Sequence, residues 1–180
     1  MPRGTPTNVS LGAGILYIGA VGVTEPTDLV SAWPAGWTQL GYTKDGSVFS
    51  YNLSTSDVEV AEELDPLLVV PTKRKISVKL ALAELTASNL KRALNGGTIT
   101  AGTGIVTFDP PAIGTEQRTA LGFQSEDGKE RWIYRKCLQT ASMTVERKKA
   151  PNYSTIDAEF TLEVVSGTFP FRAIFDSTRS

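Results

Sequence analysis

Histidine is absent from the 180 residues, and Cys137 is the only cysteine. Without histidine the chain lacks the commonest general base and metal ligand, and the usual side chain that titrates near neutral pH. A Ser–His–Asp or Cys–His catalytic site is therefore excluded. A single cysteine can form neither an intrachain disulfide nor a cysteine zinc site, which fits assembly in a reducing cytosol.

Strong net charge and long apolar runs are also missing. The chain carries 18 basic and 19 acidic residues, so no overall field attracts it to nucleic acid or to an anionic membrane. Residues 11–23 are uncharged, but they are too few to span a bilayer, which takes about 20 residues. They follow a single basic residue, Arg3, and precede no clear cleavage site. We expect neither a membrane span nor a secretory signal.

Motifs for nucleotide binding or catalysis are absent as well. Glycines are frequent around Tyr17, but that tyrosine stands where a dinucleotide fingerprint requires glycine. Glu62 and Glu63, or Asp57 and Glu59, are candidates for paired catalytic carboxylates. In an extended chain Glu62 and Glu63 point in opposite directions and no aromatic cluster accompanies them, which favours an acidic solvated loop. We expect no catalytic residue, no metal, no cofactor and no enzyme activity.

Residues 75–97 carry the clearest pattern in the chain. Apolar residues alternate with polar or small ones in the first half, which predicts a strand with one buried face, formed by Ile76, Val78, Leu80 and Leu82. Thr86 is a suitable N-cap for a helix of two or three turns, which Asn95-Gly96-Gly97 would end. Such a short helix is not stable alone, so it should flank a sheet through its apolar residues Leu90, Ala93 and Leu94.

The rest of the chain is rich in short strand patterns. Turn-forming residues separate them, notably Asp45-Gly46 and residues 126–128, whereas residues 98–103 are predicted to be a link of small residues. The pattern predicts one α+β domain over residues 1–180, mainly β, an antiparallel sandwich or barrel with one flanking helix. Residues 1–12 are expected to be a flexible N-terminal arm. Predicted strands cover residues 15–19, 37–42, 48–53, 104–108, 119–124, 131–139, 156–164 and part of 167–175.

Residues 54–74 are predicted to be a long loop between two strands, and a long insertion of this kind is usually functional or mobile. Its first part is acidic and its end is basic. Opposite charges at the two ends of a subunit suit head-to-tail stacking. The proposed stacking residues are Asp57, Glu59, Glu62, Glu63, Asp65, Lys73, Arg74 and Lys75.

A second group of basic residues has Trp132 and Tyr134 nearby and could form a nucleic-acid patch. The balanced total charge favours the simpler interpretation that these are charged faces of exposed hairpins. Trp33 and Trp37 are expected to be core or interface anchors, and Cys137 a small buried residue. The basic group comprises Lys129, Arg131, Arg135, Lys136, Arg147, Lys148 and Lys149.

Four stretches occur together in one known family. They are GILYIGAVGVTEPTDL (14–29), GWTQLGYTKDGSVF (36–49), an acidic extension ending in LDP (64–66), and the strand ISVKLALAEL followed by NLKRAL (76–94). This combination resembles the major tail protein, or tail tube protein, of long-tailed, siphovirus-type bacteriophages of actinobacterial hosts. After residue 104 the resemblance depends mainly on strand order.

The resemblance implies a virion protein, assembled in the host cytoplasm, whose copies form stacked rings of typically six subunits. Inner strands of all subunits would join in a barrel around a channel that carries DNA without sequence-specific binding and holds the tape-measure protein during assembly. Tail terminator and distal tail proteins would be further partners, and no membrane is involved. Residues expected to line the channel are the polar members of two inner hairpins, Ser50, Asn52, Ser54, Arg131, Thr140 and Thr144.

Two alternatives remain open at this point. The inner tube of a contractile tail, a tailocin or a type VI secretion system would share the same architecture. A β-sandwich carbohydrate-binding module would need an exposed aromatic platform, which only Trp132 with Tyr134 could supply.

Overall fold

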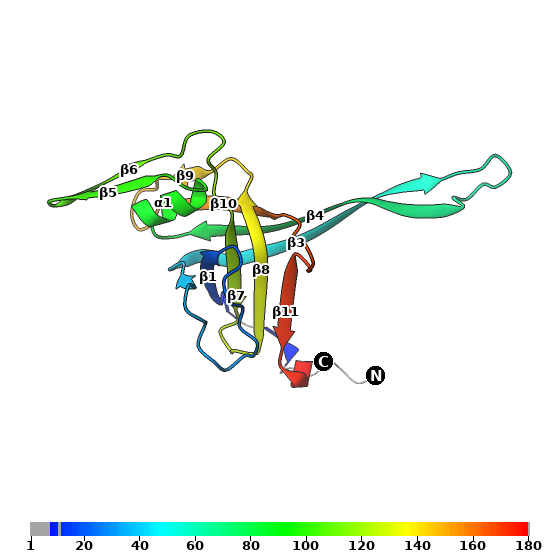
Figure 1. The fold of residues 1–180 in the computed structure, drawn as a ribbon, viewed down its shortest axis with the longest axis horizontal. Coiled ribbons are helices and arrows are strands. Elements are labelled where there is room, and N and C mark those ends of the chain that lie inside the picture. Colours follow the sequence, from blue (N-terminus) through cyan, green and yellow to red (C-terminus); the bar gives the residue numbers. More distant parts are fainter. Residues whose placement is uncertain (1–7, 11, 180) are drawn as a thin grey trace.

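The computed structural model describes residues 8–10 and 12–179 (Figure 1). Most of the predicted N-terminal arm, residues 1–7 and 11, lies outside the described residues. The elements follow one another as β1 (Ile15–Ala20), β2 (Thr38–Gln39), β3 (Thr43–Val58), β4 (Leu68–Leu82), α1 (Ala87–Ala93), β5 (Thr98–Gly102), β6 (Ile105–Asp109), β7 (Thr119–Gln124), β8 (Glu130–Gln139), β9 (Thr144–Glu146), β10 (Thr155–Leu162) and β11 (Phe171–Phe175). A short 3-10 turn, Ser177–Arg179, follows β11.

Nine of these strands form one antiparallel sheet with the order β2-β1-β7-β8-β10-β4-β3, in which β11 also pairs with β8 and β9 with β10. Strands β5 and β6 form a separate hairpin beside α1 (Figure 1). Strand residues make up 49% of the residues that the structure describes, and helical residues 6%. The predicted class, a mainly β antiparallel fold with a flanking helix, is confirmed.

One hydrophobic core joins the two halves of the sheet. Leu16 and Leu121 from the half that contains β1 and β7 pack in the same cluster as Val78 and Phe160 from the half that contains β4 and β10. The sheet therefore folds over on itself, as a sandwich does. The buried face of β4 is the predicted one, with Ile76, Val78, Leu80 and Leu82 all buried.

Helix α1 forms where the sequence pattern placed it. The Thr86 hydroxyl accepts a hydrogen bond from the backbone N–H of Asn89, so Thr86 is the N-cap. Ala93 is fully buried, and Leu90 packs against the core while partly exposed. Leu94 is the C-cap, directly after the helix, and is half-buried.

The predicted loop over residues 54–74 is largely wrong. Strand β3 continues to Val58 and β4 begins at Leu68, so only residues 59–67 connect them. The two strands pair along their whole length, and within the predicted loop the register shifts once, between Ser54 and Thr55, next to Pro71. The acidic residues and prolines indicated a loop, but a bulge accommodates the proline within the ladder. The product is a long hairpin arm that projects away from the body (Figure 1).

Two smaller predictions also differ from the structure. Asp45-Gly46 is not a hairpin turn: it lies inside β3, at an irregularity between Thr43 and Ser47, where Gly46 has a φ of 76°. The predicted link at residues 98–103 is mostly strand β5. Small residues gave no strand signal there, and pairing with β6 supplies the hydrogen bonds that hold the strand.

Candidate assembly surfaces

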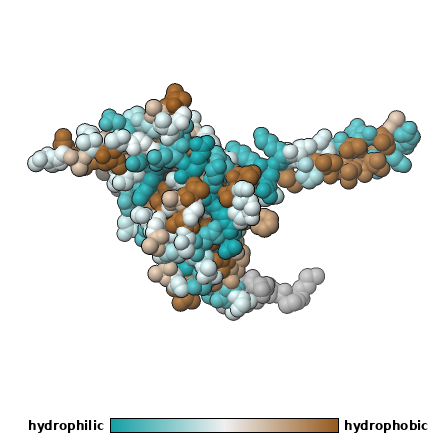
Figure 2. Space-filling view, in the orientation of Figure 1, coloured by the Kyte–Doolittle hydropathy of each residue, from teal (hydrophilic) through white to brown (hydrophobic). Residues whose placement is uncertain are grey.

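The arm formed by the outer parts of β3 and β4 is the most exposed regular structure in the described chain. Strand β3 has 16 residues, which corresponds to about 50 Å of extended chain. Apolar side chains near the tip are open to solvent, and Figure 2 shows hydrophobic atoms along this part of the arm. The exposed fractions are 65% for Leu67, 58% for Leu68, 52% for Val69 and 38% for Val70. An exposed apolar run of this kind is typical of surfaces that contact another molecule.

Charge is distributed unevenly along the same arm. The five predicted acidic residues, from Asp57 to Asp65, lie at the end of β3 and in the connection, and all are exposed. The three predicted basic residues lie on β4 nearer the body, where Lys73 pairs with Ser54 and Lys75 with Asn52. The tip is therefore acidic and the root basic, with the apolar run of β4 near the tip.

Strand β3 is also an open edge. It ends the strand order, and in the described part of the chain it pairs with β4 alone. The backbone groups on its outer side have no ladder partner among residues 8–10 and 12–179. A long edge strand left open is a template for pairing with another chain.

The exposed face of β3, β4, β10 and β8 is polar. Ser50 and Asn52 lie opposite Ser77 and Lys75, and Ser54 lies opposite Lys73, so all six share one side of the hairpin, because directly paired residues share a face. Ser50 is half-buried, and Asn52 and Ser54 are exposed.

The C-terminal strands continue this face. Thr144 lies opposite Asp157 across β9 and β10. The Thr140 hydroxyl lies 2.6 Å from that of Thr161, which stands opposite Ser77. The structure therefore brings Ser50, Asn52, Ser54, Thr140 and Thr144 together on one surface.

Arg131 does not belong to this surface, and its predicted exposure is wrong. Only 2% of the residue is accessible, because the loop between β1 and β2 covers it. Its guanidinium donates to the backbone carbonyls of Asp28 and Ser31 and lies over the Trp33 ring. The neighbouring Arg135 is bound by Glu25. Arg131 and Arg135 thus contact the loop between β1 and β2, whereas Lys136 pairs with Glu163, so the basic residues of β8 do not form one free patch.

The aromatic pair required by the carbohydrate-binding alternative is not an exposed platform. Tyr134 is buried, with 3% accessible, and Trp132 is half-buried among Phe49, Phe171 and Phe175. Burial raises the pKa of the Tyr134 phenol well above its usual value. These rings form core packing, and the interpretation as a sugar-binding surface is wrong.

Candidate chemistry is equally sparse in the part of the chain that the structure describes. Cys137 is fully buried as predicted, and burial raises the pKa of its thiol to about 12, so the thiol stays protonated at neutral pH. Glu62 and Glu63 are exposed on the arm. Residues 8–10 and 12–179 contain no group of three or more His, Cys, Asp or Glu side chains that could hold a metal ion. None of the helices described is long and apolar enough to cross a membrane.

A folded β body with an open strand edge and a partly apolar projecting arm defines a class of protein, the structural subunit that assembles with other copies. The family model for phage tail tube proteins matches residues 6–159, which include all elements from β1 to β9 and most of β10. The chain belongs to the phage tail tube protein family. It is a structural component of the virion tail that self-assembles into a tube with other tail proteins. A search of curated proteins found no match.

Sequence reasoning missed two features of these surfaces. The hairpin of β5 and β6 exposes Ile105 (66%) and Val106 (59%), and only the strand pattern of β6 was recognised. The ion pairs of Glu159 and Glu163 were also missed. Alternation along β10 does place both carboxylates on the face away from Phe160, but their cationic partners lie on other strands and at other positions in the chain.

Proposed function

We propose that copies of this chain form closed rings, most simply hexamers, that stack into the tube of a long-tailed, siphovirus-type phage. The observation that carries the proposal is the open edge of β3, 16 residues long and continuous with the arm. A second copy that paired along this edge would satisfy its backbone groups by β-augmentation. Repetition of the same head-to-tail contact closes a ring when the rotation between copies closes.

The polar face of β3, β4, β10 and β8 is proposed to line the channel for DNA. Joining these strands edge to edge around a ring would make a continuous barrel, with its polar face inside and the hydrophobic core outside. Small neutral groups suit a surface past which DNA must slide, because each phosphate contact adds affinity. The proposed channel residues are Ser50, Asn52, Ser54, Thr140 and Thr144.

The arm is proposed to connect one ring to the next. Its acidic tip would meet the basic root of a neighbouring arm, and its apolar side chains would be buried in the contact. Lys75 already contacts Glu159, so Lys73 and Arg74 are the residues proposed to receive the acidic tip. Charge complementarity of this kind sets register and association rate more than affinity.

A tube with a channel and two ends would also contact other tail proteins, inside the channel and at each end. We propose the tape-measure protein as the occupant of the channel during assembly, and tail terminator and distal tail proteins at the ends. Assembly is proposed to occur in the host cytoplasm, without a membrane step.

Negative-stain electron microscopy of the purified protein tests the ring and the tube. We expect rings or tubes at high protein concentration. The triple variant E59Q/E62Q/E63Q should polymerise more slowly while the monomer stays folded. A control with three neutralised carboxylates off the arm, D109N/E116Q/E126Q, should polymerise normally. A strictly monomeric protein at high concentration would contradict the proposed function. An unchanged polymerisation rate of the arm variant would contradict the role of the acidic tip.

A further inference from the structure

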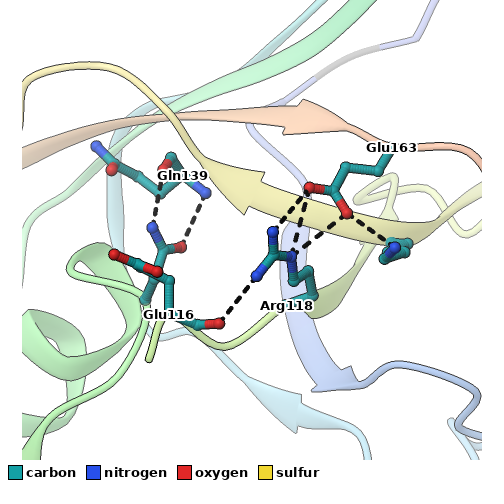
Figure 3. Close-up of polar contacts among 6 residues, drawn as sticks. Glu116, Arg118, Gln139 and Glu163 are labelled. Atoms are coloured by element: carbon teal, nitrogen blue, oxygen red, sulfur yellow. Dashed lines mark hydrogen bonds and ion pairs between the residues drawn. The ribbon is translucent and has the colours of Figure 1, made fainter. Parts of the chain in front are cut away.

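Two carboxylates on the polar face each form ion pairs with two basic side chains. Glu159 on β10 lies between two lysines of β4, with Lys75 Nζ 3.6 Å from its Oε1 and Lys79 Nζ 3.4 Å from its Oε2. Glu163, directly after β10, lies 2.9 Å from Lys136 Nζ and 3.4 Å from Nε of Arg118 (Figure 3). The two clusters follow each other along β10 and its C-terminal end.

The clusters lie on the proposed channel face. Lys79 of β4 is directly opposite Glu159 of β10. Two residues away on β4, Ser77 is opposite Thr161 of β10. Glu163 donates its backbone N–H to the carbonyl of Lys136 on the neighbouring strand. The charged groups are therefore interleaved with the neutral polar residues of this surface.

In each cluster the carboxylate lies deeper than the cations above it. The side chain of Glu159 is 18% exposed, whereas those of Lys75 and Lys79 are 50% and 60% exposed. Glu163 is 29% exposed, against 41% for Arg118 and 33% for Lys136. Viewed from solvent, this surface presents cations whose charge is reduced by a carboxylate beneath them.

Both carboxylates remain ionised at neutral pH. Partial burial raises the pKa of Glu159, but hydrogen bonds from Ser77 and Lys79 and the nearby lysine charges outweigh it, so its pKa is below the usual value. A hydrogen bond from Lys136 lowers the pKa of Glu163, with a further contribution from Arg118. The pairing is therefore present under physiological conditions.

We propose that Glu159 and Glu163 keep this face from retaining DNA. Without them, four cations on each copy would have donors available for phosphate oxygens, and each phosphate contact adds salt-dependent affinity. In a ring the contacts of all copies would add together and hold the DNA. This inference rests on the proposed function, because it needs the polar face to meet DNA. It goes beyond that function by naming Glu159 and Glu163 as the residues that make the face non-adhesive.

Removing both carboxylates while keeping their shape tests the proposal. E159Q/E163Q should bind a short fluorescent DNA duplex at low salt about tenfold or more tightly than the unmodified chain, measured by fluorescence anisotropy. The slope of log affinity against log salt concentration should steepen by about 2 to 4, since up to four phosphate contacts are added. The four cations are about one-third exposed or more and stay hydrated when the carboxylates are neutralised, so the variant should fold, which circular dichroism and urea unfolding will check.

Two further variants separate local unmasking from net charge. D109N/E126Q changes the net charge by the same amount at exposed residues that lie off both the polar face and the arm, so its DNA affinity should stay at that of the unmodified chain. Adding K75Q/K79Q to E159Q/E163Q should remove most of the gained affinity.

A folded E159Q/E163Q variant that binds DNA no better than the unmodified chain, or no better than D109N/E126Q, would overturn the inference. Tube formation by the unmodified chain is measured separately by microscopy. If tubes form and the variant gains no affinity, the masking role is wrong and the tube stands. If the variant gains affinity but tubes never form, the masking role holds and the proposed channel is wrong.

Discussion

The guanidinium of Arg131 lies 5.4 Å from the centre of the Trp33 ring, close enough for a cation–π contact. The same group donates to the carbonyls of Ser31 at 2.7 Å and Asp28 at 3.0 Å, and to Oε1 of Gln124 at 3.2 Å. Arg131 therefore attaches the loop between β1 and β2 to strand β8. Its charge is buried, and backbone carbonyls and a ring face stabilise it.

We expect R131M to lower the free energy of unfolding by about 2–4 kcal/mol, because two carbonyls and one amide lose a charged donor. R131K should restore only part of this loss, since an ammonium cannot reproduce the planar fork of donors. Urea denaturation measures both. The exposed Arg147 offers a control, and R147M should change stability by no more than about 0.5 kcal/mol. Equal effects of R131M and R147M would contradict the buried role of Arg131.

Acid should weaken the attachment of the same loop through Glu25. A hydrogen bond from Arg135 lowers the pKa of Glu25 below 4.5, with burial acting against it and Arg172 adding to it. A group whose pKa is lower in the folded state stabilises the fold above its unfolded pKa, and this contribution is lost as pH falls through the folded value. Stability should therefore fall below about pH 4.5.

The variant E25Q isolates this effect. At pH 7 it should be less stable than the unmodified chain, because Arg135 loses its carboxylate partner while it remains mostly buried. Below about pH 4 the difference between the two should shrink. Urea unfolding at a series of pH values measures it, and a difference that is constant with pH would contradict the assignment.

Asn95 joins the end of α1 to strand β8. Its side chain donates to the carbonyl of Gln139 and accepts from the N–H of the same residue, both at 2.8 Å (Figure 3). Its φ is 56°, in the left-handed region that glycine adopts without cost.

N95A should lower the free energy of unfolding by about 2–4 kcal/mol, because it loses two buried hydrogen bonds and keeps an unfavourable φ. N95G loses the same bonds but not the backbone preference, so it should be about 1 kcal/mol more stable than N95A. Thermal or urea unfolding distinguishes the two. Equal stabilities of N95A and N95G would show that backbone strain is not involved.

The apolar tip of the arm should serve assembly and contribute little to the fold. Leu68 and Val70 lie on one face of the arm, opposite Val58 and Ser56, and remain exposed in the subunit. L68S/V70S should change monomer stability by no more than about 0.5 kcal/mol per site and should reduce tube formation, measured by sedimentation and electron microscopy.

A control with exposed apolar residues elsewhere, V30S/V164S, should form tubes normally; these side chains are 94% and 82% exposed. If L68S/V70S and the control polymerise equally well, the arm tip is not a contact between copies. If L68S/V70S unfolds the monomer, the tip is part of the fold, which contradicts its assignment to assembly.

The sequence by itself determined the features that depend on neighbouring residues. Alternation from Ile76 to Leu82 set the buried face of β4, the hydroxyl of Thr86 set the start of α1, and the turn at residues 126–128 set the hairpin of β7 and β8. The lack of histidine excludes every site that needs an imidazole, whatever fold the chain adopts. The three structural features are local, because periodicity, capping and turns act over a few residues.

Only the tertiary structure decided the features that depend on distant residues. Arg131 is buried because a loop 100 residues earlier folds over it. Residues 54–58 and 68–74 are strands because they pair with each other, although their acidic residues and prolines are typical of a loop. Glu159 and Glu163 are paired because β10 lies between β4 and β8. Burial and pairing of this kind depend on which strands become neighbours. The residue pattern of one strand does not specify which strands will flank it.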